Sequence, residues 1–119
     1  MSGRKAAGDR GEAEVARYLR ENGFRLAAHG YRSRFGEIDL IAWDSDTLCF
    51  VEVKTRTNVA MALPREYVTP QKQHKLRATA MLYLAEQRLD CPTRFDVAEV
   101  YAQNGFDTAR IEYIKNAFQ

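Results

Sequence analysis

Acidic and basic side chains lie close together in two apolar segments of this chain. Glu37 and Asp39 belong to GEIDLIAW, and Glu52 and Lys54 belong to FVEVKTR, with the polar break DSDT between the segments. Aromatic and β-branched residues around an Asp/Ser break predict a β-hairpin. Ionisable groups are unusual in strands of such apolar composition. These side chains are therefore the first candidates for chemistry.

The pairing of the two strands decides which of these side chains meet. An antiparallel hairpin with this break places Asp39 opposite Val51 or Glu52. We expect Asp39 opposite Glu52, with Cβ atoms about 4.5–5.5 Å apart, because a slip by one residue would bury the carboxylates. Lys54 then shares a face with Glu52. The opposite face is uniformly apolar and consists of Ile38, Leu40, Ala42, Cys49, Val51 and Val53.

Such a pair of carboxylates is suited to a divalent cation. Adjacent carboxylates raise each other's pKa unless a positive charge lies between them, and their hard oxygen atoms suit Mg²⁺ or Mn²⁺. Asp39, Glu52 and Lys54 together match the requirements of metal-assisted attack of water on a phosphodiester. The alternative is a solvated hairpin face, because Glu-x-Lys by itself recurs freely on exposed strands.

Length and composition indicate an ordinary globular protein. The 119 residues suit one domain, with residues 1–8 flexible, and the 45% hydrophobic and 29% charged fractions exclude a disordered chain. No apolar run is long enough to span a membrane, and the start MSGRKAAGDRGE lacks a secretory h-region. Cys49 and Cys91 suggest neither a disulfide framework nor a zinc site. We expect a cytoplasmic protein.

The net charge of +2 does not by itself indicate a polyanionic partner, but the charge is unevenly distributed. Between Lys54 and Arg77 a single acidic residue, Glu66, stands among the basic residues Lys54, Arg56, Arg65, Lys72, Lys75 and Arg77. Basic residues beyond an acidic metal site would suit a surface that follows a phosphate backbone. A solvated loop and helix face is the alternative explanation.

The first predicted helix carries a further acidic candidate. It should begin with Asp9 as N-cap and end near Asn22, with Gly23 after it. Glu12 would lie at the N-terminal end of its buried side. Two roles for Glu12 remain open: it caps its own helix, or it extends towards the sheet and completes the acidic cluster.

The remaining elements complete an α/β pattern. We expect strands over residues 24–31, 94–101 and 109–114, the last at a sheet edge, and a connection over 57–68 that borders the site. Thr69 and Pro70 mark the start of a second helix that ends near Arg88. Its first turns contain Gln71, Lys72 and Lys75, and its buried side contains Leu76, Ala80, Tyr83, Leu84 and Gln87, with Met81 nearby. The order is αβββαββ, a mixed sheet flanked by helices.

Several of these segments together resemble a known family. The succession GDRGEAEVARYL, FGEIDLIA, FVEVKTR, VTPQKQHKL, RFDVAEV and IEYIKNAF resembles the YraN-type family. These are uncharacterised bacterial proteins assigned to the restriction-endonuclease-like PD-(D/E)xK superfamily. The resemblance covers about residues 8–118, and the hairpin segments are its most specific part.

The resemblance implies a fold and a set of roles. The fold would be a three-layer core similar to that of archaeal Holliday junction resolvases. Asp39 and Glu52 would bind Mg²⁺ with the backbone carbonyl of Val53, and Lys54 would help to position water. Glu12 matches the additional glutamate that resolvase-like members carry on their first helix.

The chain departs from the superfamily pattern at particular positions. Ile38 replaces the proline of the named motif, and Gly30 stands where an asparagine is expected. No QxxxY signature follows Gln71 or Gln73, which disfavours an exonuclease of that type. The family itself has no established activity.

We therefore predict a metal-dependent nuclease acting on DNA, including branched DNA, with Arg56, Gln71, Lys72 and Lys75 guiding the backbone. The competing hypothesis is a nucleic-acid-binding module whose nuclease site is silent, which predicts salt-dependent binding without turnover. A third is an interaction domain that uses the fold as a scaffold. A homodimer would suit cleavage of two strands, although no segment marks an interface.

Overall fold

The structure, a computed structural model, describes residues 3–57 and 68–119. Its elements are α1 (Gly3–Glu21), β1 (Arg25–Ser33), β2 (Gly36–Asp44), β3 (Thr47–Arg56), α2 (Pro70–Gln87), β4 (Thr93–Tyr101), the short 3₁₀ helix η2 (Phe106–Thr108) and β5 (Arg110–Phe118). The predicted order αβββαββ is confirmed. Most of the predicted connection over 57–68 lies outside the described residues.

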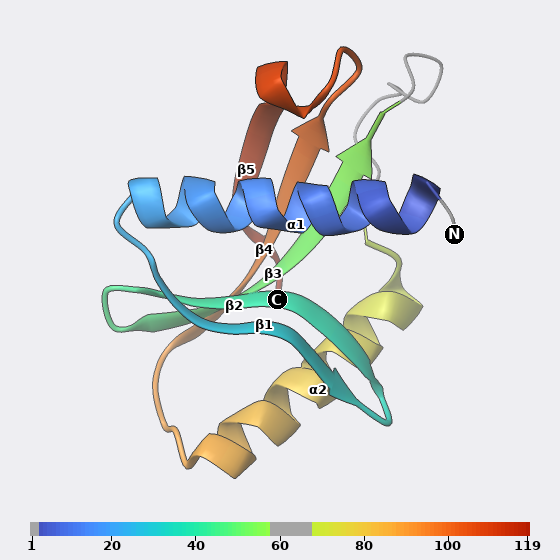
Figure 1. Ribbon diagram of the computed structural model, residues 1–119. Coiled ribbons are helices and arrows are strands. Elements are labelled where there is room, and N and C mark those ends of the chain that lie inside the picture. Colours follow the sequence, from blue (N-terminus) through green and yellow to red (C-terminus); the bar gives the residue numbers. More distant parts are fainter. Residues whose placement is uncertain (1–2, 58–67) are drawn as a thin grey trace.

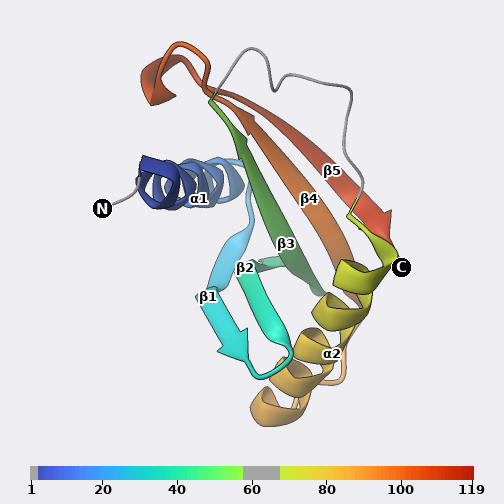
Figure 2. The same ribbon diagram turned by 90° about the vertical axis from the view of Figure 1, so that its right-hand side faces the viewer.

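A single five-stranded sheet has the strand order β1-β2-β3-β4-β5. The central pair β3–β4 is parallel, and the other pairs are antiparallel. Parallel neighbours need a crossover, which here contains α2. The two helices lie on opposite sides of the sheet, so the molecule has three layers (Figures 1 and 2). As predicted, β5 is an edge strand.

Each face of the sheet has its own apolar core. Under α1 the core consists of Val15, Ala16, Leu19, Phe24, Leu40, Ala42, Cys49, Val51, Ala98 and Val100. Under α2 it consists of Ile38, Ile41, Leu48, Phe50, Val68, Leu76, Ala80, Tyr83 and Val97. Because both faces are apolar, an ionisable side chain on β2 or β3 must lie beyond the edge of one of these cores.

The predicted apolar hairpin face is confirmed except at one residue. Leu40, Ala42, Cys49 and Val51 face α1 as expected, whereas Ile38 packs in the α2 core. The tip of the β1–β2 hairpin bends onto α2 (Figure 2). The hydroxyl oxygens of Ser33 and Thr79 are 3.2 Å apart there.

Helix α2 begins as predicted, and α1 does not. Thr69 caps α2, its side chain accepting a hydrogen bond from the Lys72 amide at 3.2 Å, with Pro70 at the first position. Helix α1 begins at Gly3, so Asp9 lies inside the helix and is not its N-cap. The preceding sequence RKAA consists of good helix formers, which explains the longer helix.

The buried side of α2 is mostly the predicted one. Its buried residues are Leu76, Thr79, Ala80 and Tyr83. Gln87 is exposed, and Met81 is 70% exposed, so the prediction for these two residues is wrong. None of the described helices has both the length and the apolar character that a membrane crossing requires.

Candidate active site

The candidate site lies where β2 and β3 separate. The two strands pair from Asp44 and Thr47 to Leu40 and Val51. The next position in this register would place Asp39 opposite Glu52, which is the predicted alignment. There the Asp39 carboxylate accepts a hydrogen bond from the Val53 backbone N–H, with Oδ2 and N 2.8 Å apart. The fork between the strands is therefore held by a side chain.

Asp39 has an unusual protonation equilibrium. Burial, followed by the nearby charge of Glu52, raises the pKa of Asp39 to about 7, although the hydrogen bond from Val53 and the charge of Lys72 act in the opposite direction. Glu12 adds to the rise. Burial is therefore the main reason why the neutral form of Asp39 is favoured, and the neighbouring carboxylates add to it.

Glu52 is buried and forms an ion pair with Lys72, which we predicted to contact DNA. The Lys72 Nζ lies 2.6 Å from Glu52 Oε2, and Glu52 is only 7% exposed. Burial lowers the pKa of Lys72, but the hydrogen bond and charge of Glu52 outweigh it, so the pKa is raised overall. The pairing of a β3 carboxylate with an α2 lysine depends on how the crossover packs, so sequence spacing could not reveal it.

Glu12 extends from α1 towards the same cluster. Its pKa is raised, chiefly by burial and also by Glu37 and Asp9, while the charge of His29 and a hydrogen bond to Asp39 act against the rise. His29 Nε2 lies 3.7 Å from Glu12 Oε1. Glu12 lies well inside α1, so it does not cap the start of the helix, and its side chain lies near His29 and Asp39.

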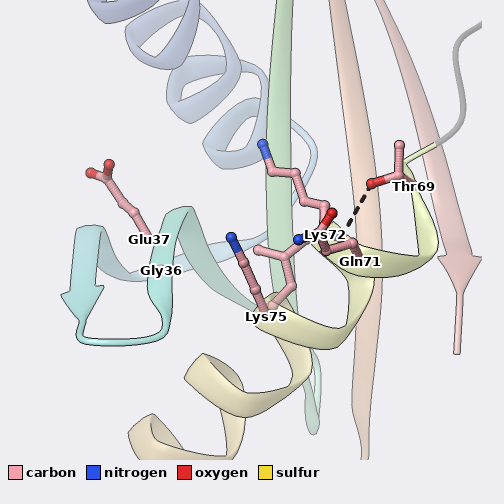
Figure 3. Close-up of a pocket in the computed structure, with 7 residues that line it drawn as sticks. Gly36, Glu37, Thr69, Gln71, Lys72 and Lys75 are labelled. Atoms are coloured by element: carbon pink, nitrogen blue, oxygen red, sulfur yellow. Dashed lines mark hydrogen bonds between the residues drawn. The ribbon is translucent and has the colours of Figure 1, made fainter.

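A pocket of about 360 Å³ opens beside the cluster, between the β1–β2 hairpin and the first turns of α2. Its walls are formed by Gly36, Glu37, Thr69, Gln71, Lys72, Lys75 and Leu76. Figure 3 shows the Lys72 and Lys75 side chains leaving α2 near each other, with Gly36 and Glu37 on the neighbouring β2 strand. Glu37 forms an ion pair with Arg32, whose Nε lies 3.4 Å from its Oε2. The predicted residues Gln71, Lys72 and Lys75 therefore share one concave surface.

Two predicted residues have different surroundings. Arg56, predicted to guide a DNA backbone, is buried, and its guanidinium lies 3.8 Å from the fully buried Glu99. Lys54 is half-buried and is the register partner of Glu99 on β4. It forms no ion pair within 4.0 Å with any residue that the structure describes. The lysine that contacts Glu52 is Lys72.

The donor set can be compared with the needs of a metal ion. Within residues 3–57 and 68–119, no three His, Cys, Asp or Glu side chains are grouped closely enough to hold a metal together. Glu12 is thus not assembled with Asp39 and Glu52 as a three-carboxylate cage. Mg²⁺, however, is typically bound through one or two carboxylates, with water and substrate phosphate completing its shell. Asp39 and the buried Glu52 interact electrostatically, and their hard carboxylate oxygens fit such an ion.

Comparison with known proteins supports the predicted family and fold. The family model described as "Uncharacterised protein family UPF0102" matches residues 11–100. UPF0102 proteins from Trichlorobacter lovleyi and Syntrophus aciditrophicus are 43% identical over 118 residues and 45% identical over 113 residues. These alignments cover 98% and 94% of this chain, and 92% and 87% of the relatives.

The fold is similar to that of a solved resolvase. Hjc from Archaeoglobus fulgidus, a Holliday junction resolvase, matches with a TM-score of 0.54 and 22% sequence identity, over 91% of this chain and 76% of that one. The predicted three-layer α/β fold, similar to that of an archaeal Holliday junction resolvase, is thereby confirmed.

Proposed function

The chain belongs to the uncharacterised protein family UPF0102, and we propose that it is a metal-dependent nuclease that hydrolyses phosphodiester bonds in DNA. The observation that carries this proposal is the position of Asp39, which lies one step beyond the last β2–β3 pair and interacts electrostatically with the buried Glu52. A scaffold does not need a half-buried carboxylate beside a buried one, since their repulsion costs stability. A hydrolase that binds a divalent ion does need them.

The residues at the point where β2 and β3 separate would bind the metal ion. Asp39 and Glu52 would hold Mg²⁺ or Mn²⁺, together with the Val53 carbonyl, because the N–H and C=O of one strand residue point to the same side and the Val53 N–H already points at Asp39. Glu12 would act through Asp39 or a water molecule. When bound, the ion would lower the pKa of water and neutralise phosphate charge.

The basic residues would position the substrate. Lys54 would orient the attacking water or the phosphate from the face that it shares with Glu52. Gln71 and Lys75 line the pocket beside the cluster and would contact the DNA backbone. The resolvase fold supports branched DNA as the first substrate to test, with a homodimer as the arrangement for cutting two strands.

Cleavage of a labelled four-way DNA junction and of its linear duplex arm, with Mg²⁺ or Mn²⁺ and with EDTA, tests the proposal. We expect metal-dependent cleavage by the wild type and its loss in both Asp39→Asn and Glu52→Gln. Asp46→Asn is the matched control, because it removes the same charge from an exposed turn residue. Full activity of Asp39→Asn and Glu52→Gln would exclude this site.

A second function deserves a test because Lys72 already compensates Glu52 at 2.6 Å. A nucleic-acid-binding module with a silent site could keep this ion pair permanently. Such a protein would bind the junction with a salt dependence set by its phosphate contacts and would release no product with any divalent ion. Binding measured by fluorescence anisotropy, together with cleavage measured on a gel, separates the two functions.

A further inference from the structure

The ion pair between α2 and β3 suggests a second role for Lys72. Its ammonium lies 2.6 Å from Glu52 Oε2, while its side chain is still half exposed towards the pocket. Among the residues that the structure describes, no other cation lies within 4.0 Å of Glu52. Lys72 therefore belongs both to the carboxylate pair and to the basic pocket.

We propose that Lys72 is an internal counter-ion that a metal ion and a DNA phosphate displace together. This inference rests on the proposed function, because it assigns a metal to Asp39 and Glu52. An ammonium and a divalent cation that need the same Glu52 oxygen compete, since two positive charges at one carboxylate repel. In the protein without DNA, metal binding must therefore break the Lys72–Glu52 pair.

The displaced ammonium has a suitable new position. Lys72 and Lys75 are three residues apart on α2, which places them on neighbouring parts of one helix face, and both line the pocket of about 360 Å³. Figure 3 shows both side chains on the pocket side of the helix. A DNA phosphate in this pocket would attract Lys72 away from Glu52.

Metal and DNA then strengthen each other's binding. DNA that attracts Lys72 exposes Glu52 for the metal, and a metal on Glu52 releases Lys72 for the phosphate. By linkage, each ligand raises the affinity of the other by the same factor. In the absence of substrate, Lys72 remains paired with Glu52.

The experiment begins with titration of Mn²⁺ alone, at constant pH and without DNA, into the wild type, Lys72→Met, Lys72→Arg and Lys75→Met. We expect Lys72→Met to bind Mn²⁺ about tenfold more tightly than the wild type. Lys72→Arg keeps the competing charge and should bind as weakly as the wild type. Lys75→Met is the matched control, because Lys75 lines the pocket without contacting Glu52, and its Mn²⁺ affinity should not change.

The second part measures binding of a four-way DNA junction by anisotropy, with Ca²⁺ and with EDTA. The factor by which Ca²⁺ tightens DNA binding should be smaller in Lys72→Met than in Lys75→Met or the wild type. Lys72→Gln, with far-UV circular dichroism, replaces Lys72→Met if the latter does not fold. An unchanged or weaker Mn²⁺ affinity in the folded Lys72 variant would overturn the inference.

The outcomes for this inference and for the nuclease proposal are separable. Cleavage by the wild type combined with an unchanged Mn²⁺ affinity in Lys72→Met would overturn the counter-ion role and leave the nuclease intact. Tighter Mn²⁺ binding by Lys72→Met without cleavage of any DNA would support the counter-ion role and reject the nuclease. Absence of Mn²⁺ binding in all variants would overturn both.

Discussion

The Asp39 carboxylate accepts a hydrogen bond from the Val53 amide, 2.8 Å away, directly beyond the last paired residues of β2 and β3. This bond connects one candidate metal ligand to the backbone beside the other, Glu52. The two strands therefore diverge at a defined point, and Asp39 and the segment from Glu52 to Lys54 are oriented by one interaction. The site is part of the sheet geometry and does not depend on a surface loop.

The free energy of unfolding should depend on Asp39 between about pH 4 and pH 7 in the metal-free protein. Its pKa is about 7 in the folded state and about 3.9 in an unfolded chain. Because the folded state holds the proton more tightly, the contribution of Asp39 to stability falls as pH rises through this window. Asp39→Asn should lose less stability between pH 5 and pH 8 than the wild type, as measured by urea unfolding in EDTA. Asp46→Asn should behave as the wild type, and equal pH slopes for all three proteins would contradict the prediction.

Close packing of α1 on β3 should make Gly11→Ala destabilising. A Cβ at Gly11 would lie 1.9 Å from the Thr55 hydroxyl oxygen, so the helix that carries Glu12 would have to move. We expect a loss of about 1–3 kcal/mol in the free energy of unfolding, measured by urea denaturation.

The control for this packing prediction is Gly8→Ala in the same helix. A Cβ there meets nothing within 4 Å, so this change should stabilise by about 0.5–1 kcal/mol. Thr55→Ala should rescue Gly11→Ala. If Gly11→Ala proves as stable as Gly8→Ala, the tight contact between α1 and β3 does not exist.

Asp96 ties the edge strand β5 to the sheet, and Tyr113→Phe should weaken this attachment. The fully buried Asp96 carboxylate accepts hydrogen bonds from the Tyr113 hydroxyl at 2.6 Å, from Arg94 Nε at 2.9 Å and from the Asn116 amide at 2.9 Å. Burial and the charge of Asp96 raise the pKa of Tyr113, so the phenol remains a donor. Removal of the Tyr113 hydroxyl in Tyr113→Phe should lower the free energy of unfolding by about 1–3 kcal/mol.

Tyr18→Phe is the matched control for the Asp96 network. The rings of Tyr18 and Tyr113 are 5.7 Å apart, but the Tyr18 hydroxyl forms no hydrogen bond with the residues that the structure describes. Its stability should stay within about 0.5 kcal/mol of the wild type. Equal losses in the two variants would show that ring packing, and not the bond to Asp96, holds β5.

Salt dependence should identify Lys75 as a phosphate contact. Lys75→Gln should reduce the slope of log affinity against log salt concentration by about 1 for duplex DNA, because Lys75 is exposed and lines the pocket beside the carboxylates. Anisotropy titrations at several salt concentrations measure this slope. Lys115→Gln, on β5 and 3.6 Å from Asp44 at the far end of β2, should leave it unchanged. A slope in Lys75→Gln equal to the wild-type slope would remove Lys75 from the interface.

Local patterns predicted the elements and the carboxylate alignment for clear physical reasons. Alternation along GEIDLIAW and FVEVKTR allowed one register that kept the carboxylates out of an apolar face, and the structure has that register. Thr69 and Pro70 predicted the start of α2, because an N-cap residue and a proline at the first helical position act within a few residues. The start of α1 differs from the prediction because the good helix formers before Asp9 extend the helix to Gly3.

Contacts between distant segments could not be predicted in this way. Arg56 looked like a surface cation beside Lys54, yet it is buried with Glu99, which is 43 positions later. The cation on Glu52 proved to be Lys72, although Lys54 is only two residues away. Ile38 packs in the core under α2, beside the hairpin tip, and not in the core under α1.

The sequence by itself determined the elements, their order and the register that brings Asp39 near Glu52, because propensity, alternation and capping act over short distances. Only the tertiary structure decided which cations face which carboxylates. That choice depends on how the crossover helix α2 and the first helix α1 pack on opposite faces of the sheet, which brings Lys72 to Glu52 and Glu12 to Asp39. Side chains that are far apart along the chain meet through this packing, and their spacing in the sequence does not predict these contacts.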